Sequence, residues 1–311
     1  MLLRFLGTSA GELYPGLWCR CRNCQSARQG DPKQRRMSAA LYIESDNGFG
    51  TRGNRARDVR NADAREPTGG VLIDFPSEIA TQASLYAVDL PDLRHLLVTH
   101  SHGDHWFPYL LRWRGRPAEI CRNGETAPTH IGGPRFTELP DLHIWGNANV
   151  EAVLRRELGD DLAYFSVTFH AVRPQTEFVV GALIVNALPA NHDVGREEAL
   201  HYVLTDGHRT ILYGLDGDTF LPETRERLRA FRFDLVIMES TYGLGNGTNH
   251  RNFARLQEEA DWLRTEKLIT PGGQIVATHF SPHHCPPHEE TSDILRRHNI
   301  MAAWDGMEIQ L

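Results

Sequence analysis

A six-residue stretch, His-Ser-His-Gly-Asp-His, begins at His100 and contains three histidines and one aspartate. Alternate side chains of an extended segment project to one side, so His100 and His102 can chelate one ion. The turn at Gly103 lets Asp104 and His105 face a second ion. Imidazole and carboxylate ligands suit zinc, iron or manganese and leave coordination positions open for water. The stretch therefore predicts a catalytic metal centre that needs further ligands from elsewhere in the chain.

Further candidate ligands follow later apolar runs, each at the end of a predicted strand. They are His192 in LPANHD, Asp216 in LYGLDGD and His279 in VATHFS. Asp218 in the same Gly-rich turn is the second choice after Asp216. Because loops at strand ends can carry chemistry on a rigid scaffold, we expect these side chains to join the histidine cluster.

Strands alternate with helical segments along the chain. Apolar runs and alternation predict strands at 2–8, 39–48, 69–76, 93–100, 141–147, 162–172, 181–192, 233–240 and 274–280, and a hairpin at 200–218. Helical periodicity predicts helices at 77–90, 148–158, 223–231 and 252–269. This order predicts an α/β fold with two packed sheets and outer helices, in a single domain over residues 1–311. The polar, Gly- and Arg-rich stretch at 46–68 predicts a flexible insertion.

The composition limits the partners of the protein. Hydrophobic residues make up 41% of the chain and the net charge is −7, so the chain can bury a core but has no basic surface typical of duplex-binding proteins. We therefore expect no nucleic-acid partner, although the Arg-rich part of the 46–68 stretch would be the place for one. No segment has the length and hydropathy of a membrane span or signal peptide, which predicts a cytoplasmic protein with no membrane partner.

The ligand motifs together identify the sequence as similar to the metallo-β-lactamase superfamily, whose H-x-H-x-D-H signature it matches without departure. The resemblance implies a four-layer αββα sandwich with two mixed sheets and an active site that holds two divalent ions, either zinc or manganese, with iron as an alternative. It implies that one ion binds His100, His102 and His192, that the other binds Asp104, His105 and His279, and that Asp216 bridges them. Asp74 is expected to orient a ligand histidine by a hydrogen bond.

A second metal site is indicated by the spacing of Cys19, Cys21 and Cys24, whose thiolates can hold one tetrahedral zinc that needs a fourth ligand. This feature resembles the C-P lyase pathway phosphodiesterase (phosphoribosyl cyclic phosphodiesterase) and the pyrroloquinoline quinone synthesis protein B subgroup. In the phosphodiesterase the fourth ligand is a histidine three positions after the last catalytic histidine, where this chain has Pro282. The choice is therefore His283, with the two following residues, His284 and Cys285, as alternatives. Such a closed site would be structural.

These features predict a dinuclear metal-dependent hydrolase, in first place a phosphodiesterase that acts on a small phosphate ester, cyclic esters included, through a metal-bridging hydroxide. Asp104 and His250 are the expected catalytic residues, the latter because an Asn-His loop resembles that of the phosphodiesterase. The alternatives are hydrolysis of a lactone, thioester or RNA, and a role as oxygenase or carrier in pyrroloquinoline quinone synthesis. Relatives often form homodimers, but no segment of this sequence establishes the assembly, so a monomer and a homodimer both stay open. Of the remaining residues, His201 and His208 are assigned to the hairpin or surface, while Trp106 either walls the pocket or packs beneath it.

Overall fold

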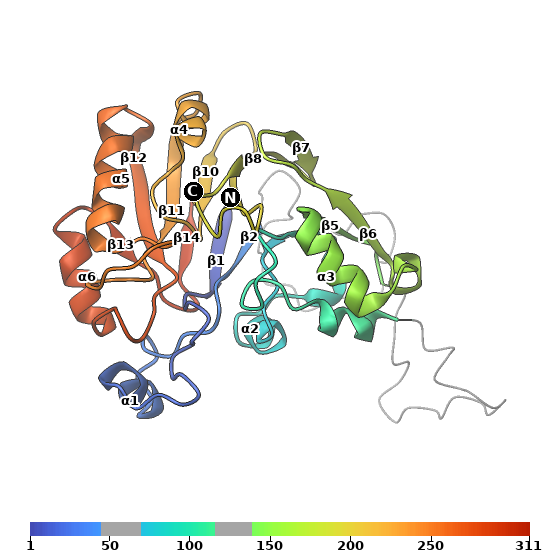
Figure 1. Cartoon of the computed structure of the whole chain (residues 1–311), viewed down its shortest axis with the longest axis horizontal. Helices are drawn as coiled ribbons and strands as arrows, with labels where there is room; N and C mark the ends of the chain where they lie inside the picture. The colour runs from blue at the N-terminus through green and yellow to red at the C-terminus, as the bar shows by residue number, and fades with distance from the viewer. Residues whose placement is uncertain (45–69, 116–138) are drawn as a thin grey trace, which may run out of the picture.

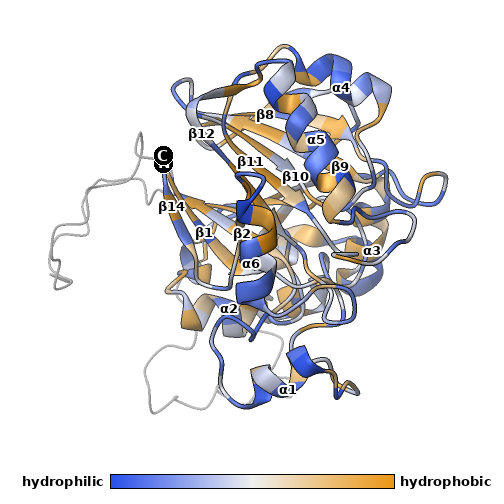
Figure 2. Cartoon of the chain, turned by 90° about the vertical axis from the view of Figure 1, so that its left-hand side faces the viewer, coloured by the Kyte–Doolittle hydropathy of each residue, from blue (hydrophilic) through white to orange (hydrophobic). Residues whose placement is uncertain are grey.

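Two mixed β-sheets pack face to face in the computed structural model, and helices cover their outer faces (Figures 1 and 2). The structure describes residues 1–44, 70–115 and 139–311. The predicted insertion at 46–68 lies outside these residues. The N- and C-termini lie beside each other, because the last strand pairs with the first (Figure 1).

The first sheet joins the two ends of the chain to its first half. Within the described ranges it has seven strands, in the order β14 (Glu308–Gln310), β1 (Leu2–Gly7), β2 (Ala40–Glu44), β3 (Val71–Ile73), β4 (His95–Leu97), β5 (Leu142–Gly146) and β6 (Val167–Ala171). The strands from β14 to β3 pair antiparallel, and those from β3 to β6 pair parallel. The carboxyl ends of the parallel strands therefore meet at one edge.

The second sheet repeats this mixed pattern in the other half of the chain. Its seven strands in the described ranges run in the order β13 (Met301–Ala302), β12 (Ile269–Thr278), β11 (Phe233–Glu239), β10 (Thr210–Gly214), β9 (Leu200–Thr205), β8 (Leu183–Pro189) and β7 (Glu177–Val180). The pairs from β13 to β10 are parallel, and the pairs from β10 to β7 are antiparallel. Strands β9 and β10 form the predicted hairpin.

Helices α2 to α6 each bury one face against a sheet. Helices α2 (Ile79–Leu85) and α3 (Ala148–Leu158) cover the first sheet, whereas α4 (Pro222–Leu228), α5 (Phe253–Thr265) and α6 (His288–Arg296) cover the second. The 3₁₀ turns among the described residues are η1 (Leu90–Asp92), η2 (Pro108–Arg114) and η4 (Leu162–Phe165). Asn147 begins α3 because its side chain accepts a hydrogen bond from the backbone N–H of Val150.

Side-chain alternation separates three apolar layers. In β4, Leu97 points into the core between the sheets while Leu96 points outward to the helices. In β1, Leu3 and Phe5 enter the same inner core as Leu97. The strands are thus buried on both faces, as the predicted arrangement of two packed sheets with outer helices requires. This burial fixes the pairing register of the strands and with it the position of the loops at their ends.

Several elements differ from the sequence prediction. Helix α1 (Arg22–Arg28) forms within the cysteine segment, and α6 and β7 were not predicted. The strand predicted at 162–172 begins only at Val167, because η4 occupies its first residues. The helix predicted to reach residue 269 ends at Thr265, where the chain turns into β12. No helix in the described ranges is both long and apolar enough to cross a membrane.

Candidate metal centre

The candidate ligands converge at one edge of the two sheets. His100 follows β4, His192 follows β8, Asp216 follows β10 and His279 follows β12. His279 has a φ of 56°, in the left-handed region that non-glycine residues rarely adopt. A left-handed residue at the end of a strand is typical of a functional site.

One group of ligand atoms consists of His100, His102 and His192, here called the first triad, whose ligand atoms all lie within 4.8 Å of one another. The imidazoles of His102 and His192 approach most closely, with 3.2 Å between Nδ1 and Nε2. Their three rings meet edge to face, with centroids 4.6 to 5.0 Å apart. Nitrogens directed at one point in this way can share an ion.

A second group, here called the second triad, consists of Asp104, His105 and His279 and meets the same distance limit. The Nε2 atoms of His105 and His279 lie 3.2 Å apart, and Asp104 Oδ2 lies 3.4 Å from the first and 3.7 Å from the second. The two triads are adjacent, because the rings of His100 and His105 have centroids 4.3 Å apart.

Asp216 lies between the triads. Its Oδ2 is 3.7 Å from Nε2 of both His100 and His192, and 3.4 Å from Nε2 of His105. Its Oδ1 is 3.2 Å from Nε2 of His279. Asp218, the second choice from the sequence, instead accepts a hydrogen bond from Arg255 Nη1 at 2.9 Å. The structure thus places Asp216 among the histidines and pairs Asp218 with an arginine.

The donor set is suited to divalent cations. His100 Nε2 and Asp216 Oδ1 are buried and have no hydrogen-bond partner. Buried polar atoms normally have hydrogen-bond partners, so two such atoms within one cluster of imidazoles and carboxylates call for a further group in the site. A divalent cation is the group that this mixture of nitrogen and oxygen ligands binds.

Electrostatics in the site also favour cations. Burial alone would lower the pKa of His105, but the carboxylates of Asp216, Asp104 and Asp74 raise it well above the usual value. Burial alone would raise the pKa of Asp216, but His279 and His105 hold it well below the usual value. The Asp216 carboxylate is therefore ionised, which is the state that binds metal.

Asp74 supports the second triad through a hydrogen bond to the ring nitrogen of His105 that does not face the site. This fully buried carboxylate accepts a hydrogen bond from His105 Nδ1 at 2.9 Å through Oδ2. Its Oδ1 accepts hydrogen bonds from the backbone N–H of Thr99 at 2.8 Å and from the Thr99 hydroxyl at 2.9 Å. With Nδ1 bound to Asp74, the His105 ring presents Nε2 to the site.

His250 enters the site from the loop between β11 and α5. One of its ring nitrogens lies within 4.8 Å of ligand atoms of His192 and Asp216. Its Nδ1 lies 3.2 Å from Oε1 of the fully buried Glu239. Burial alone would lower the pKa of His250, but the hydrogen bond to Glu239 raises it to about 9. The ring is therefore protonated at neutral pH.

Two residues that the sequence analysis did not identify, Glu239 and Thr241, form hydrogen bonds that position His250 and His279. Glu239 accepts hydrogen bonds from the Thr241 hydroxyl at 2.7 Å and from the Arg251 backbone N–H at 2.8 Å. The Thr241 hydroxyl also lies 2.8 Å from Nδ1 of His279. The available signal was a charged residue, Glu239, at the end of the otherwise apolar strand FDLVIMES.

The three cysteines of the predicted second metal site lie at the start of α1 or just before it. The thiols of Cys19, Cys21 and Cys24 lie within 4.8 Å of one another. The backbone N–H of Cys21 donates to Cys19 Sγ and lowers the pKa of that thiol, whereas burial raises the pKa of Cys24 to about 12. Of the candidate fourth ligands, His283 lines a hollow together with Cys19. Cys285 instead directs its buried Sγ toward the carbonyl oxygen of Ser240 at 3.5 Å.

The remaining sequence assignments have clear locations. His201, assigned to the hairpin or surface, is in the hairpin but buried, and its Nε2 donates to the Leu215 carbonyl oxygen at 2.9 Å. His208 is exposed in the turn. Trp106 packs beneath the site, where its Nε1 donates to the Val150 carbonyl oxygen at 3.1 Å.

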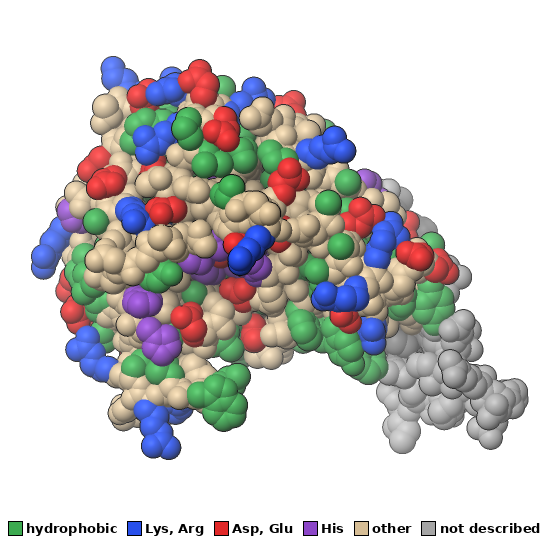
Figure 3. All heavy atoms as spheres, viewed as in Figure 1, with side chains coloured by type: hydrophobic (Ala, Val, Ile, Leu, Met, Phe, Trp, Pro, Cys, Tyr) green, Lys and Arg blue, Asp and Glu red, His purple; other side chains and the backbone are tan. Residues whose placement is uncertain are grey.

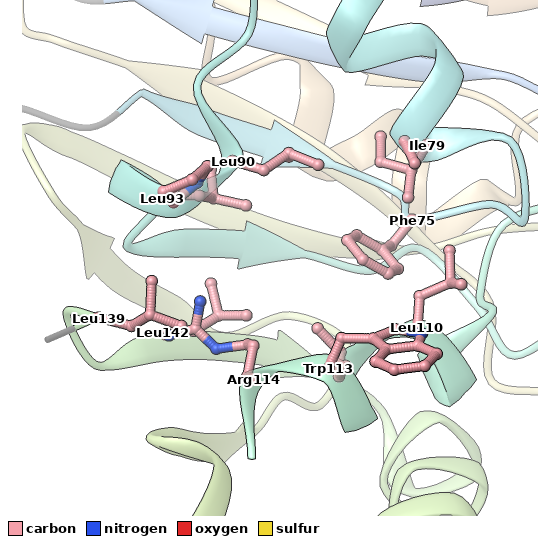
Figure 4. A pocket seen from close by; sticks show the side chains of 12 residues that line it. Phe75, Ile79, Leu90, Leu93, Leu110, Trp113, Arg114, Leu139 and Leu142 are labelled. Carbon is pink, nitrogen blue, oxygen red and sulfur yellow. The ribbon is translucent and has the colours of Figure 1, made fainter. Parts of the chain in front are cut away.

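A separate apolar hollow lies on the outer side of the first sheet. It measures about 500 Å³, and Figure 4 shows Phe75, Ile79 and Leu110 around it. Among the described residues that line it, Arg114 is the one ionisable group. The hollow therefore has none of the paired ligands or proton donors that the metal centre offers.

Comparisons with known proteins agree with this geometry. Residues 70–280 match the family model described as a beta-lactamase superfamily domain. A search of curated proteins gives no match. A solved diphosphatase from the PhnP family is similar over 100% of this chain and 97% of its own, with 22% identity and a TM-score of 0.67.

Two further solved structures have the same fold. Zn²⁺-bound PqqB from Methylobacterium extorquens covers 100% of both chains with 16% identity and a TM-score of 0.67. The short form of human tRNase Z covers 100% of this chain and 99% of its own, with 17% identity and a TM-score of 0.59. With the family model spanning residues 70–280 and the ligand groups assembled, the chain belongs to the beta-lactamase superfamily and is a metal-dependent hydrolase.

Proposed function

We propose that this hydrolase is a dinuclear phosphodiesterase that acts on a small phosphate ester, cyclic diesters included. The observation that carries the proposal is the position of Asp216 between the two triads, with oxygens 3.2 to 3.7 Å from histidines of both. A carboxylate in that position would bridge two ions, each of which the adjoining triad would hold. Zinc or manganese suits these ligands, and iron is the alternative.

When bound, a pair of divalent ions supplies Lewis acidity to water and neutralises charge on phosphate oxygens. The carboxylates of Asp104 and Asp216 keep the site electronegative enough to retain such ions. Asp74 fixes the ring of His105 so that Nε2 faces the centre. The half-exposed His102, with 41% of its side chain accessible, marks the side from which substrate enters.

His250 is the proton donor of the proposed reaction. An alkoxide that leaves a phosphodiester needs a proton, and a positioned imidazolium is a suitable general acid. Glu239 stabilises the protonated form of His250 and orients its ring through Nδ1. The tilted ring of His250 lies against that of His192, with centroids 4.8 Å apart, which places the donor beside the first triad.

The three cysteines and His283 would hold a structural zinc. Asn23 links the cysteine segment to the turn after His279, because its Nδ2 donates to the carbonyl oxygens of Pro282 at 3.0 Å and Cys285 at 2.7 Å. Zinc at this junction would favour the thiolate of Cys24, which burial otherwise disfavours, and would fasten the N-terminal loop beside the catalytic centre.

The test is hydrolysis of bis(p-nitrophenyl) phosphate by protein of measured metal content. Wild type and the Asp216→Ala variant are compared after loading with zinc, manganese or iron. We expect metal-dependent turnover in wild type and its loss in the variant, because both triads lose their shared ligand.

Asp218→Ala is the matched control, since it removes a carboxylate two residues away that pairs with Arg255. It should retain turnover. Absence of diester hydrolysis in every fully loaded form of wild type would reject the phosphodiesterase proposal and direct the search to lactones and thioesters.

A further inference from the structure

An indole with almost no protein contact projects from the N-terminal loop. Trp18 is 97% exposed and its neighbour Leu17 is 76% exposed. Figure 3 shows hydrophobic side chains protruding from the lobe that carries α1, below the histidines exposed on the same face. Adjacent large apolar side chains left in water are characteristic of a binding surface.

These side chains border a hollow of about 520 Å³, a size that suits a small-molecule ligand. The residues that line it include Gly11, Glu12, Leu17, Trp18, Arg20 and His283. The hollow thus combines an aromatic face, an exposed guanidinium and an exposed carboxylate, which together can recognise a flat ring with polar substituents.

The hollow adjoins the metal centre through Gly11. A methyl group placed on Gly11 would stand 3.1 Å from Oδ2 of Asp104, so the backbone here lies directly against the second triad. The Ala10 N–H donates to the Phe280 carbonyl oxygen at 3.0 Å, and Ser281 Oγ donates to Glu12 Oε1 at 3.0 Å. These bonds align the loop with the turn that follows the ligand His279.

The loop is also held in shape near the indole. Arg28 donates to the carbonyl oxygens of Gly16 at 2.8 Å and Cys19 at 2.6 Å, on either side of Trp18. The Cys19 N–H donates to the Gly16 carbonyl oxygen at 3.2 Å. A backbone anchored on both sides presents the indole with little loss of conformational freedom on binding.

We propose that Trp18 determines specificity by stacking on an aromatic or heteroaromatic ring in the organic group of the ester. The phosphate would lie at the triads, while the ring would occupy the hollow beside Trp18, with Arg20 and Glu12 at its edge. This inference rests on the proposed function, because it assigns a place to the part of the substrate that the metal centre does not bind.

Two synthetic diesters test the proposal. Both are methyl diesters whose hydrolysis is followed by chromatography; one, the phenyl diester, carries a phenylmethyl group as its second ester and the other carries a cyclohexylmethyl group of similar size. For wild type we expect a lower KM for the phenyl diester. Because the stacking partner is lost, Trp18→Ala should raise the KM for the phenyl diester by about tenfold and leave kcat nearly unchanged.

Trp18→Phe should restore most of the preference, because it keeps an aromatic face. Leu85→Ala is the control, since this side chain is also exposed but belongs to α2. Equal KM values for the two diesters in wild type, or an unchanged KM in Trp18→Ala, would overturn the proposal. A change confined to the oligomeric state of Trp18→Ala would also overturn it and assign the indole to an interface between copies of the chain.

A binding measurement separates this inference from the proposed activity. Titration with phenylphosphonate and cyclohexylphosphonate, followed by calorimetry on metal-loaded protein, requires no turnover. Tighter binding of the phenyl compound that Trp18→Ala abolishes would support the stacking site even if neither diester is cleaved. Equal binding of both compounds would refute it whether or not the diesters are hydrolysed.

Discussion

The Asp74→Asn substitution tests how the fold supports its metal ligands. Asparagine keeps the shape of the side chain and one carbonyl oxygen that can still accept from the Thr99 N–H. It replaces the oxygen that faces His105 with an NH₂ donor. Since His105 Nδ1 donates to Asp74 over 2.9 Å, the variant sets two donors against each other in a fully buried place.

The imidazole can relieve this conflict only by moving its proton to Nε2, the atom that faces the site. Loss of such a supporting hydrogen bond lowers metal affinity by about 10–100-fold, or about 1.4–2.7 kcal/mol. A buried polar group left unsatisfied costs about 1–3 kcal/mol of folding free energy. Asp74→Asn should therefore weaken metal binding and lower the melting temperature together.

The assay is competition with a chelator of known affinity, with bound metal quantified at each chelator concentration, and thermal unfolding of the metal-free protein. The control is Asp92→Asn, which removes an exposed carboxylate of η1. Wild-type metal affinity in Asp74→Asn, with the fold intact, would refute the supporting role of Asp74.

Three further predictions follow from other parts of the structure. Cys21→Ser should lower the metal content by about one ion per chain and reduce thermal stability more than turnover, and an unchanged metal count would reject the cysteine site. His250→Gln should reduce kcat by about 10²–10⁴-fold at unchanged metal content, whereas a wild-type rate would remove its role as proton donor. Burial and the neighbouring His143 lower the pKa of His95 to about 4 from an ordinary 6.5, so the fold favours the neutral ring. The free energy of unfolding should therefore decline as the pH falls from about 6.5 toward 4, and His95→Leu should decline less over that range in denaturant titrations.

The ligand cluster was predictable because it is local and because the later ligands each follow an apolar run. His100 to His105 form one turn, and strands long enough to be read from hydropathy precede His192, Asp216 and His279. Membership of the beta-lactamase superfamily and the two packed sheets were confirmed. The roles of the individual ligands remain predictions for the experiments above.

Other features depend on contacts that the sequence does not encode locally. Glu239 acts on His250 only because the end of β11 and the following loop fold against each other. Helix α6 has only nine residues and buries His288, Thr291 and Leu295, so one buried aliphatic side chain marks its inner face and the short segment was not predicted as a helix. Helix α1 has only seven residues and buries an asparagine and a cysteine, so its sequence has no apolar periodicity from which a helix could be predicted.

The most direct test of the central claim is the dependence of turnover on metal content. Metal-free Cys21→Ser protein, which lacks the cysteine site, is titrated with manganese while bound ions and hydrolysis of bis(p-nitrophenyl) phosphate are measured on the same samples. The account predicts that two ions bind per chain and that turnover reaches its maximum only with the second. Full turnover with one ion bound, or turnover that persists without metal, would contradict a dinuclear centre.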